Sequence, residues 1–487
     1  MSFRCLIIFL LVGTAMFPQE QQVQDFIEKI ASTDQRNISD LIELYNEFQK
    51  HPLNLNTTKN DDFEDFPFFT IYQSTLILAY KKQMNGFVEV DEIRVLNIFS
   101  EEELTFLLPL LTITFTVPNI SYSSFKMEQV IRYSEVFEEQ TGYKDKLKGS
   151  KPVFYFRNKQ RWDEHLRIGI TIQKDAGEYL YNPNYTNGFD FVSASLHYKP
   201  KKRILKEVLI GDYSLNFGQG LLIWTGFSMG KGVTSTRSDK NGLTLLPYHS
   251  SDEVHFMRGV SARFAHQNIS FIPFISYKQV DAEIQPDSTI RSIRINGLHR
   301  TENEISQKDA IEELLIGGHI NYKRSNKQIG FQIVSMNYSF PFEYQSNYQK
   351  QYSTGNQTTL SSIDHSVVGK NWQFFGELAI NQSGKTAFIE GLNFYATPNI
   401  TFNTTIRKYS AGYKSFYANS FGERSYANNE IGFYNGININ LGNSYALKTY
   451  FDLYAFPSFS YGEGKAVHGQ DFFSEIQKKL SAKSLIY

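Results

Sequence analysis

Four side chains of the kinds that bind metals lie within seven positions: His249, Asp252, Glu253 and His255. Imidazole and carboxylate groups together form the ligand sets of zinc and related sites. In an extended chain, neighbouring side chains point to opposite faces, which puts Glu253 and His255 on one face and Asp252 on the other. A border between a loop and a strand explains the same residues equally well. We therefore predict neither a metal site nor a cofactor here.

Residues 211–259 are rich in glycine and also contain Trp224 and Phe227. Glycines at this spacing occur in phosphate-binding loops, but the Gly-Lys-Ser/Thr ending is missing and no helical pattern follows. Bulges, sharp bends and close backbone contacts inside a β-barrel explain them better. With no catalytic constellation that stands out, the chain is predicted not to be an enzyme. The glycines concerned are Gly218, Gly220, Gly226, Gly230 and Gly232.

The elements that must position these residues alternate between apolar and polar side chains from about residue 125 to the end. Residues 166–173 and 400–407 alternate most clearly. The runs are about 10 residues long, which is longer than usual for soluble sheets and suits strands that cross a membrane. Short turns at 323–327 and 442–444 contrast with long loops at about 281–309 and 344–369. This pattern predicts a transmembrane antiparallel β-barrel of roughly 16 strands over residues 125–487.

The alternation assigns the two faces of each strand. Three arginines, Arg167, Arg258 and Arg407, are candidates for lining the lumen, although Arg258 is equally explained as a solvated loop charge. The same pattern places Thr171, Asn403 and Asn438 inside and Leu166, Ile170, Phe402 and Ile439 towards lipid. A soluble sandwich, whose apolar faces pack inward, would alternate in the same way. The 41 Phe and 30 Tyr residues suit strands and the water–lipid boundary, and the net charge of −1 gives no basic footprint for nucleic acid.

The first fifteen residues predict export. Arg4 precedes the apolar run 5–12, and small residues follow at 13–15. This order is typical of a secretory signal peptide, and the run is too short to span a bilayer as a helix. Cys5 is the only cysteine, so the mature chain is expected to hold no disulfide and no thiolate site. At the other end, residues 483–487 do not alternate cleanly, which suggests a fragment that stops before its barrel closes.

Residues 20–118 are predicted to be helical, and within them 52–113 carry a recognisable motif. The run begins Pro-Leu-Asn-Leu-Asn-Thr-Thr at 52–58, continues Ala-Tyr-Lys-Lys at 79–82 and reaches Gly-Phe at 86–87. It resembles the tandem helix-hairpin-helix module of the competence-type DNA receptors. That family binds phosphate through glycine-rich hairpins, whereas the hairpins at 66–70 and 97–102 contain no glycine and an acidic flank follows. The candidate contacts for DNA or a partner are Lys81, Lys82 and Arg94.

The whole chain resembles a group of outer-membrane proteins of Bacteroidota-type bacteria that carry an N-terminal helix-hairpin-helix domain. The matching residues are 173–178, 211–221, 247–253 and 256–259. The resemblance implies a small all-α domain in the periplasm, followed by a barrel in contact with outer-membrane lipid. A periplasmic protein partner is the expected contact of the helical domain. The expected function is non-enzymatic, in transport, surface binding or envelope assembly; the alternative is an envelope protein that binds or takes up DNA.

Overall fold

The structure is a computed structural model, and most of the chain between residues 38 and 486 is described. The predicted signal peptide at 1–15 lies outside the described residues. None of the described helices is long and apolar enough to cross a membrane. The described residues are 38–58, 63, 66, 68–99, 101–113, 125–138, 141–162, 165–180, 188–201, 204–226, 238–240, 243–344, 352, 354–397, 399–424, 426–441, 445–458, 466–481 and 484–486.

The N-terminal module, which we define as the described residues from 38 to 113, is a small helical unit with its own core. Phe66, Phe69, Ile77 and Ile93 are fully buried at its centre. Two very short parallel strands close it, an addition to the expected all-α fold. The elements are α2 (Ile38–Lys50), β1 (Leu53–Asn54), α4 (Ile71–Met84), η2 (Val90–Leu96), α5 (Glu101–Leu107), η3 (Leu108–Leu110) and β2 (Leu111–Thr112).

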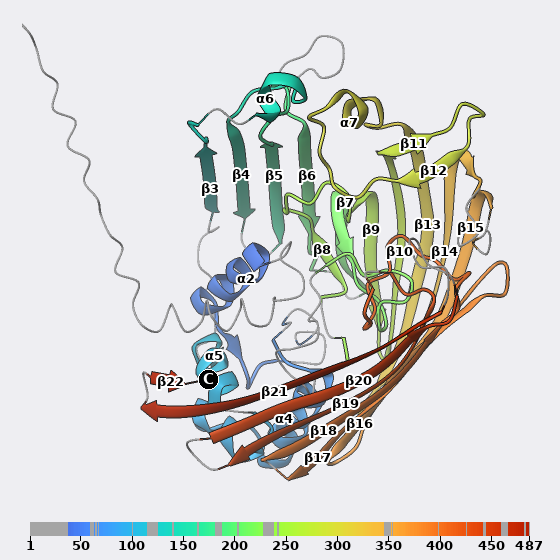
Figure 1. The fold of residues 1–487 in the computed structure, drawn as a ribbon. Helices are drawn as coiled ribbons and strands as arrows, with labels where there is room; N and C mark the ends of the chain where they lie inside the picture. Colours follow the sequence, from blue (N-terminus) through green and yellow to red (C-terminus); the bar gives the residue numbers. More distant parts are fainter. Residues whose placement is uncertain are drawn as a thin grey trace, which may run out of the picture.

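The rest of the described chain forms one antiparallel barrel sheet, in which the strands follow one another as a meander (Figure 1). Sixteen of its strands have eight residues or more, which agrees with the predicted number. They are β3 (Phe125–Ser134), β4 (Val153–Trp162), β5 (Leu166–Lys174), β6 (Phe191–Tyr198), β7 (Leu205–Leu215), β9 (Met257–His266), β10 (Ile269–Val280), β13 (Ile311–Arg324), β14 (Lys327–Phe342), β15 (Gly355–Val368), β16 (Trp372–Asn381), β17 (Thr386–Thr397), β18 (Ile400–Tyr409), β19 (Glu430–Leu441), β20 (Tyr445–Phe456) and β21 (Val467–Ser481).

Shorter strands and helices lie in the loops and at the edges of this sheet. They are β8 (Leu245–Pro247), β11 (Ala282–Ile284), β12 (Ile290–Ile293), β22 (Ser484–Ile486) and the helices α6 (Gly142–Asp145) and α7 (Glu302–Ser306). Neighbouring long strands are in register over most of their length; β13 and β14, for example, pair from Glu313↔Tyr338 to Arg324↔Lys327. Strands inside the sheet, such as β14 between β13 and β15, pair on both sides, so their backbone polar groups are satisfied without solvent.

Period-two alternation gives the barrel an apolar outside. Along β18, Phe402 and Ile406 are exposed by 41% and 46%, whereas Asn403 and Arg407 are buried by more than nine-tenths. The same holds in β5, where Ile170 is exposed and Thr171 is buried. A soluble sandwich would bury these apolar side chains. Because they point outward from the barrel instead, that alternative is excluded.

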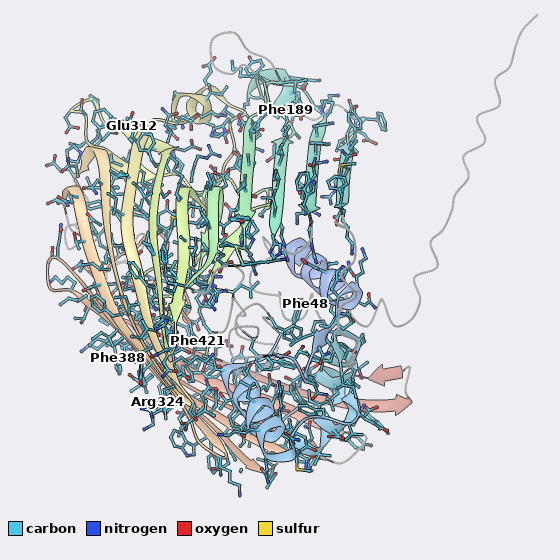
Figure 2. All side chains as sticks on the ribbon, turned by 180° about the vertical axis from the view of Figure 1, so that it is seen from behind. Phe48, Phe189, Glu312, Arg324, Phe388 and Phe421 are labelled. Atoms are coloured by element: carbon cyan, nitrogen blue, oxygen red, sulfur yellow. The ribbon has the colours of Figure 1, made fainter. Side chains whose placement is uncertain are left out.

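The two ends of the barrel differ. Glu312 and Phe189 mark the end with long loops, and Arg324 marks the end with short turns (Figure 2). The N-terminal module lies at the short-turn end, away from α6 and α7 (Figure 1). Its α4 touches the barrel through Tyr72, whose ring stacks on Tyr395 at 3.8 Å between centroids and whose hydroxyl donates to the carbonyl of Lys370.

Candidate functional site in the barrel interior

Two loops from the long-loop end fold inward and fill the barrel. We call residues 216–226 and 410–421 the inner segments. Leu221, Leu222 and Ile223 have no exposed surface, and Phe217 is 1% exposed. They join the inward side chains of the strands in one apolar cluster. At this level, therefore, the described residues form a packed core inside the barrel.

Two glycines make the tight approach of the first inner segment possible. Gly218 has φ +57° and Gly220 has φ +77°, a region that other residues rarely adopt. A Cβ on Gly218 would lie 2.8 Å from Oε2 of Glu377, and one on Gly220 would lie 2.6 Å from the carbonyl oxygen of Asn419. Gly218 and Gly220 therefore serve close backbone contact inside the barrel, as the sequence indicated, whereas Gly230 and Gly232 lie outside the described residues.

Glu377, an inward residue of β16, anchors this turn. Its Oε2 accepts hydrogen bonds from the backbone N–H groups of Gln219 and Leu221, at 2.7 and 3.1 Å. Its Oε1 accepts from Gln332 Nε2 at 2.9 Å and from Ser362 Oγ at 2.6 Å. One buried carboxylate thus joins the first inner segment to strands β14, β15 and β16. Charge-assisted bonds of this kind are the strong ones in a protein interior.

The second inner segment holds the first from the other side. Tyr413 donates to the carbonyl of Leu221 at 2.9 Å, and Ser415 donates to the carbonyl of Leu222 at 2.7 Å. The N–H of Trp224 donates to the carbonyl of Tyr417 at 2.7 Å. These bonds satisfy backbone groups that would otherwise be buried without partners.

A formal nucleophile-elbow spacing lies at the end of the first inner segment, where Gly226, Ser228 and Gly230 are in a Gly-x-Ser-x-Gly arrangement. Such an elbow needs a strand before it and a helix after it. Residues 227–237 lie outside the described part of the chain, and the described flanks at 216–226 and 238–240 contain no helix. The spacing alone therefore supports no catalytic assignment.

The structure places the three candidate lumen arginines differently. Arg407 is fully buried between β18 and β19, where it contacts Glu430 at 2.5 Å and Asp452 with two bonds of 3.0 Å. Arg167 contacts Glu47 of the N-terminal module at 3.2 Å. Arg258 is half-exposed and forms a bidentate pair with Asp212, at 2.7 and 2.8 Å.

The structure does not gather the four residues of the histidine-rich stretch into one site. His255 pairs with Asp252 at 2.8 Å, while His249 is buried against β5 and β6 and receives a bond from Thr171 through its carbonyl. Glu253 lies apart from that pair, against Gly297.

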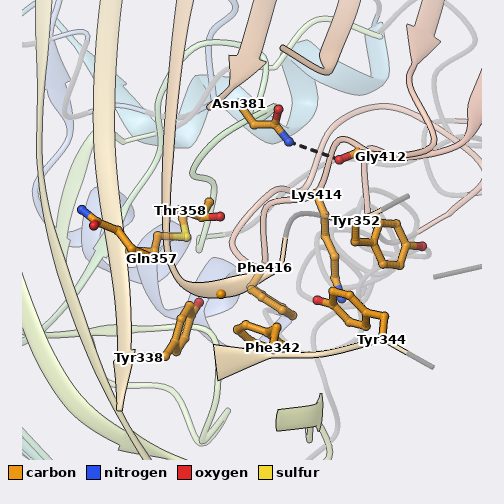
Figure 3. A pocket seen from close by; sticks show the side chains of 12 residues that line it. Tyr338, Phe342, Tyr344, Tyr352, Gln357, Thr358, Asn381, Gly412, Lys414 and Phe416 are labelled. Carbon is orange, nitrogen blue, oxygen red and sulfur yellow. Dashed lines mark hydrogen bonds between the residues drawn. The ribbon is translucent and has the colours of Figure 1, made fainter. Parts of the chain in front are cut away.

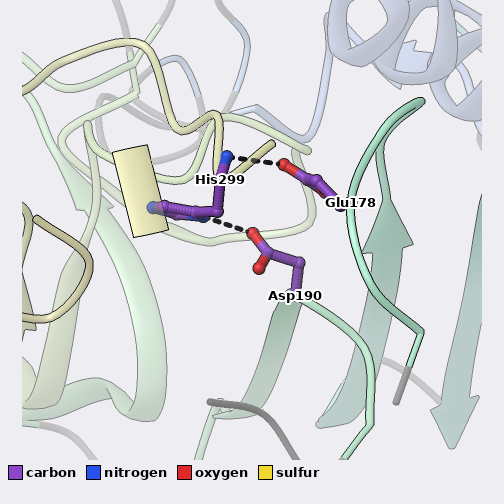
Figure 4. A group of neighbouring side chains, drawn as sticks. All are labelled: Glu178, Asp190 and His299. Carbon is purple, nitrogen blue, oxygen red and sulfur yellow. Dashed lines mark hydrogen bonds and ion pairs between the residues drawn. The ribbon is translucent and has the colours of Figure 1, made fainter. Parts of the chain in front are cut away.

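A different cluster brings together three groups that could bind a metal, namely the carboxylates of Glu178 and Asp190 and the imidazole of His299 (Figure 4). Nδ1 of His299 lies 2.6 Å from Asp190, and Nε2 lies 2.6 Å from Asp281. Burial alone would lower the pKa of His299, but these two hydrogen bonds raise it to about 10. An imidazolium that donates from both nitrogens has no lone pair for a metal. In this state, the cluster joins the loop between β5 and β6 to the loop before α7, and we call it the loop clasp.

Lys414 of the second inner segment lies among aromatic rings near the long-loop end (Figure 3). Its ammonium is 4.3 Å from the ring centroid of Phe416, 5.1 Å from Tyr352 and 5.8 Å from Tyr344. Burial lowers the pKa of Lys414 to about 8. Cation–π contacts compensate part of the lost hydration and help to fix this segment.

The candidate contacts of the N-terminal module are partly engaged within the module. Lys81 donates to the carbonyl of Thr58 at 2.8 Å, and Arg94 pairs with Asp91 at 3.0 Å. Lys82 lies on the same helix, α4. The N-terminus of α4, where a hairpin of the DNA-binding kind would take a phosphate, is closed by a capping box. There, Thr70 accepts from the N–H of Gln73, whose side chain accepts from the N–H of Thr70.

Comparison with known proteins gives a likeness in fold only. No protein-family model matches the chain, and no curated protein matches it. A solved anion-selective porin from Comamonas acidovorans is 13% identical, with a TM-score of 0.31 and coverage of 73% of this chain and 98% of the porin. OpdQ of Pseudomonas aeruginosa is 12% identical, with a TM-score of 0.36 and coverage of 74% and 87%. The outer-membrane protein opdK of the same bacterium is 10% identical, with a TM-score of 0.36 and coverage of 68% and 82%.

Proposed function

We propose that this chain is a non-enzymatic outer-membrane β-barrel protein whose interior is occluded at rest. It would serve gated transport, surface binding or envelope assembly rather than open diffusion. The observation that carries the proposal is the pair of inner segments, whose central residues are buried. Glu377 bonds the first segment to the barrel wall, and Tyr413 and Ser415 bond the second segment to the first.

The outer belt supports the membrane location. Ile316, Ile320, Ile329, Ile333 and Ile363 lie on neighbouring strands and are each exposed by 47–52%. Such a continuous apolar face is unfavourable in water, by about 25 cal/mol per Å² of apolar surface, and favourable in lipid.

The end with short turns would face the periplasm, because bacterial barrels keep short turns on that side and long loops outside. The N-terminal module would then be periplasmic and free to contact a protein partner on the surface that the barrel leaves uncovered. We propose that the order α4, η2 and α5 represents the helix-hairpin-helix arrangement expected from the sequence.

DNA handling is the weaker alternative. Phe68 and Phe69, at the first hairpin, are buried in the module's core, and the neighbouring Tyr72 stacks on the barrel. The capping box already uses the N–H groups of Thr70 and Gln73, so fewer amides at the α4 N-terminus are available for a phosphate.

Conductance in planar lipid bilayers tests the occluded interior. The native protein should conduct far less than an open sixteen-stranded pore. Glu377→Ala removes the acceptor for four donors and should produce frequent large openings. Glu312→Ala, an identical change at an exposed outward position, is the matched control and should behave as the native protein does. A native protein that conducts steadily, at a level that Glu377→Ala leaves unchanged, would refute the proposal.

A further inference from the structure

A cavity of about 110 Å³ lies between the first inner segment and the N-terminal module. Phe217 and Gly218 of the inner segment lie on one side, and the hydroxyl-bearing Ser74 and Thr75 of α4 lie on the other. Inward side chains of β13 and β15 form its wall. We call it the basal cavity. Its volume accommodates several water molecules or a small solute.

In the cavity wall, Oδ1 of Asn321 has no hydrogen-bond partner among the described residues, and Nε2 of His319 and Oδ2 of Asp364 face each other at 3.5 Å without forming a hydrogen bond. All three side chains are more than nine-tenths buried. Buried polar atoms are nearly always satisfied, and leaving one without a partner costs about 1–3 kcal/mol. Three such atoms around one cavity therefore suit a polar occupant, either water or a solute.

The wall is held in place for this role before any ligand binds. The ring of His319 stacks on Phe217 at 4.6 Å, and its Nε2 lies 3.5 Å from Oδ2 of Asp364. Gly330 pairs with Asn321 on one side and with Asp364 on the other. A Cβ there would lie 2.2 Å from Oδ2 of Asp364, so the glycine leaves the space that the carboxylate uses.

The charges around the cavity select the class of ligand. Asp364 presents a carboxylate oxygen, which repels anions, while Lys240, 4.8 Å above the ring of Trp224, repels cations. The orphan atoms include acceptors as well as an imidazole nitrogen. A hydroxyl group both donates and accepts, so it satisfies either kind. We propose that the basal cavity binds a small, neutral, hydroxyl-rich solute, of which a saccharide is the natural example.

Solute binding in the basal cavity goes beyond the proposed function. It is measured on the purified full-length protein, and the result does not depend on whether the protein conducts. Trp224 lines the cavity and is one of only three tryptophans in the chain, so its fluorescence reports on occupancy. The probes are glucose, galactose and maltose, with gluconate and glucosamine as charged comparators of similar shape. Isothermal titration calorimetry on the same samples gives an independent dissociation constant.

We expect saturable binding of at least one neutral sugar and at least tenfold weaker binding by Asp364→Asn, which keeps the shape and removes the charge. Asp287→Asn, the same change in an exposed loop, should bind as the native protein does. A native circular dichroism spectrum for each variant establishes that it is folded. Three results would each overturn the inference: no saturable binding of any neutral sugar, binding that Asp364→Asn leaves unchanged, or tighter binding of gluconate or glucosamine than of glucose.

Discussion

Arg407 of β18 points into the barrel and links its own strand to the next two, β19 and β20. Its guanidinium has no exposed surface and contacts both Glu430 and Asp452. Arg407→Met would leave two carboxylates buried without a partner, so we expect a loss of about 3–5 kcal/mol in the free energy of unfolding. Unfolding of the protein by guanidinium chloride, starting from lipid vesicles, measures this free energy. The triple variant that adds Glu430→Gln and Asp452→Asn should recover most of the loss, and a single variant as stable as the native protein would contradict the pairing.

The loop clasp at Glu178 and His299 predicts a pH dependence. Burial, with help from Asp190, raises the pKa of Glu178 to about 7 from its usual 4.5. As pH rises, the unfolded state therefore releases this proton at a lower pH than the folded state does. The free energy of unfolding falls between pH 4.5 and 7, by roughly 3 kcal/mol at most. His299, with its pKa raised to about 10, loses its contribution as pH rises from 6.5 towards 10.

Amide hydrogen exchange at residues 297–301, corrected for intrinsic rates, measures this dependence. Protection should decrease from about pH 5 to pH 7 in the native protein and decrease much less in Glu178→Gln. Protection that rises over this range would contradict the clasp.

From the sequence, the face of a strand on which a residue lies is easier to predict than the residues with which it pairs. Alternation placed Arg407 on the polar face of its strand, but Glu430 and Asp452 follow 23 and 45 positions later and no spacing links them. His299 likewise lies more than 100 positions from Asp190 and Glu178, which share the loop between β5 and β6. Glu377 gave no signal, because a lone inward glutamate in a strand looks like any lumen residue.

Among the elements, α4 depends on the barrel for its position. Tyr72→Ala or Tyr395→Ala removes the stacked pair, and we expect either to release the module and to increase amide exchange along α4 several-fold. Tyr322→Ala, on the outward face of β13, is the control and should change nothing in α4. Equal exchange in all four proteins would show that other contacts hold the module.

The first hairpin also predicts weak DNA binding. The full-length protein should show no salt-dependent retention on duplex DNA, because the α4 N-terminus is capped and its flank lies on the barrel. A variant with Phe68→Gly, Thr70→Gly and Glu101→Gly should gain some retention if the lost glycines are the cause. Tight binding by the native protein at physiological salt would favour DNA uptake instead.

Most strands were predictable because alternation is local, and the count of about sixteen follows from it. The predicted long loop at 344–369 was wrong, because most of it forms strand β15. The inner segments were not, because apolar runs such as 221–223 show no period that distinguishes a plug from a strand. Within the module, helical spacing places Leu76 beside Ile77 in the core, but Leu76 is only half-buried, while Phe68 and Phe69 of the hairpin lie inside. Tertiary packing decided these positions.

For the whole molecule, the central claim is that the barrel spans the outer membrane with its apolar face in lipid and its interior occluded. Spin labels on single cysteines, in a Cys5→Ser background, test it directly at Phe402, Ile406, Asn403 and Thr405 of β18. In native outer membranes, labels at 402 and 406 should be reached by oxygen and not by a water-soluble nickel complex. Labels at 403 and 405 should be reached poorly by both, because the interior is packed. Nickel access at 402 and 406, or recovery of the protein in the soluble periplasmic fraction, would contradict the account.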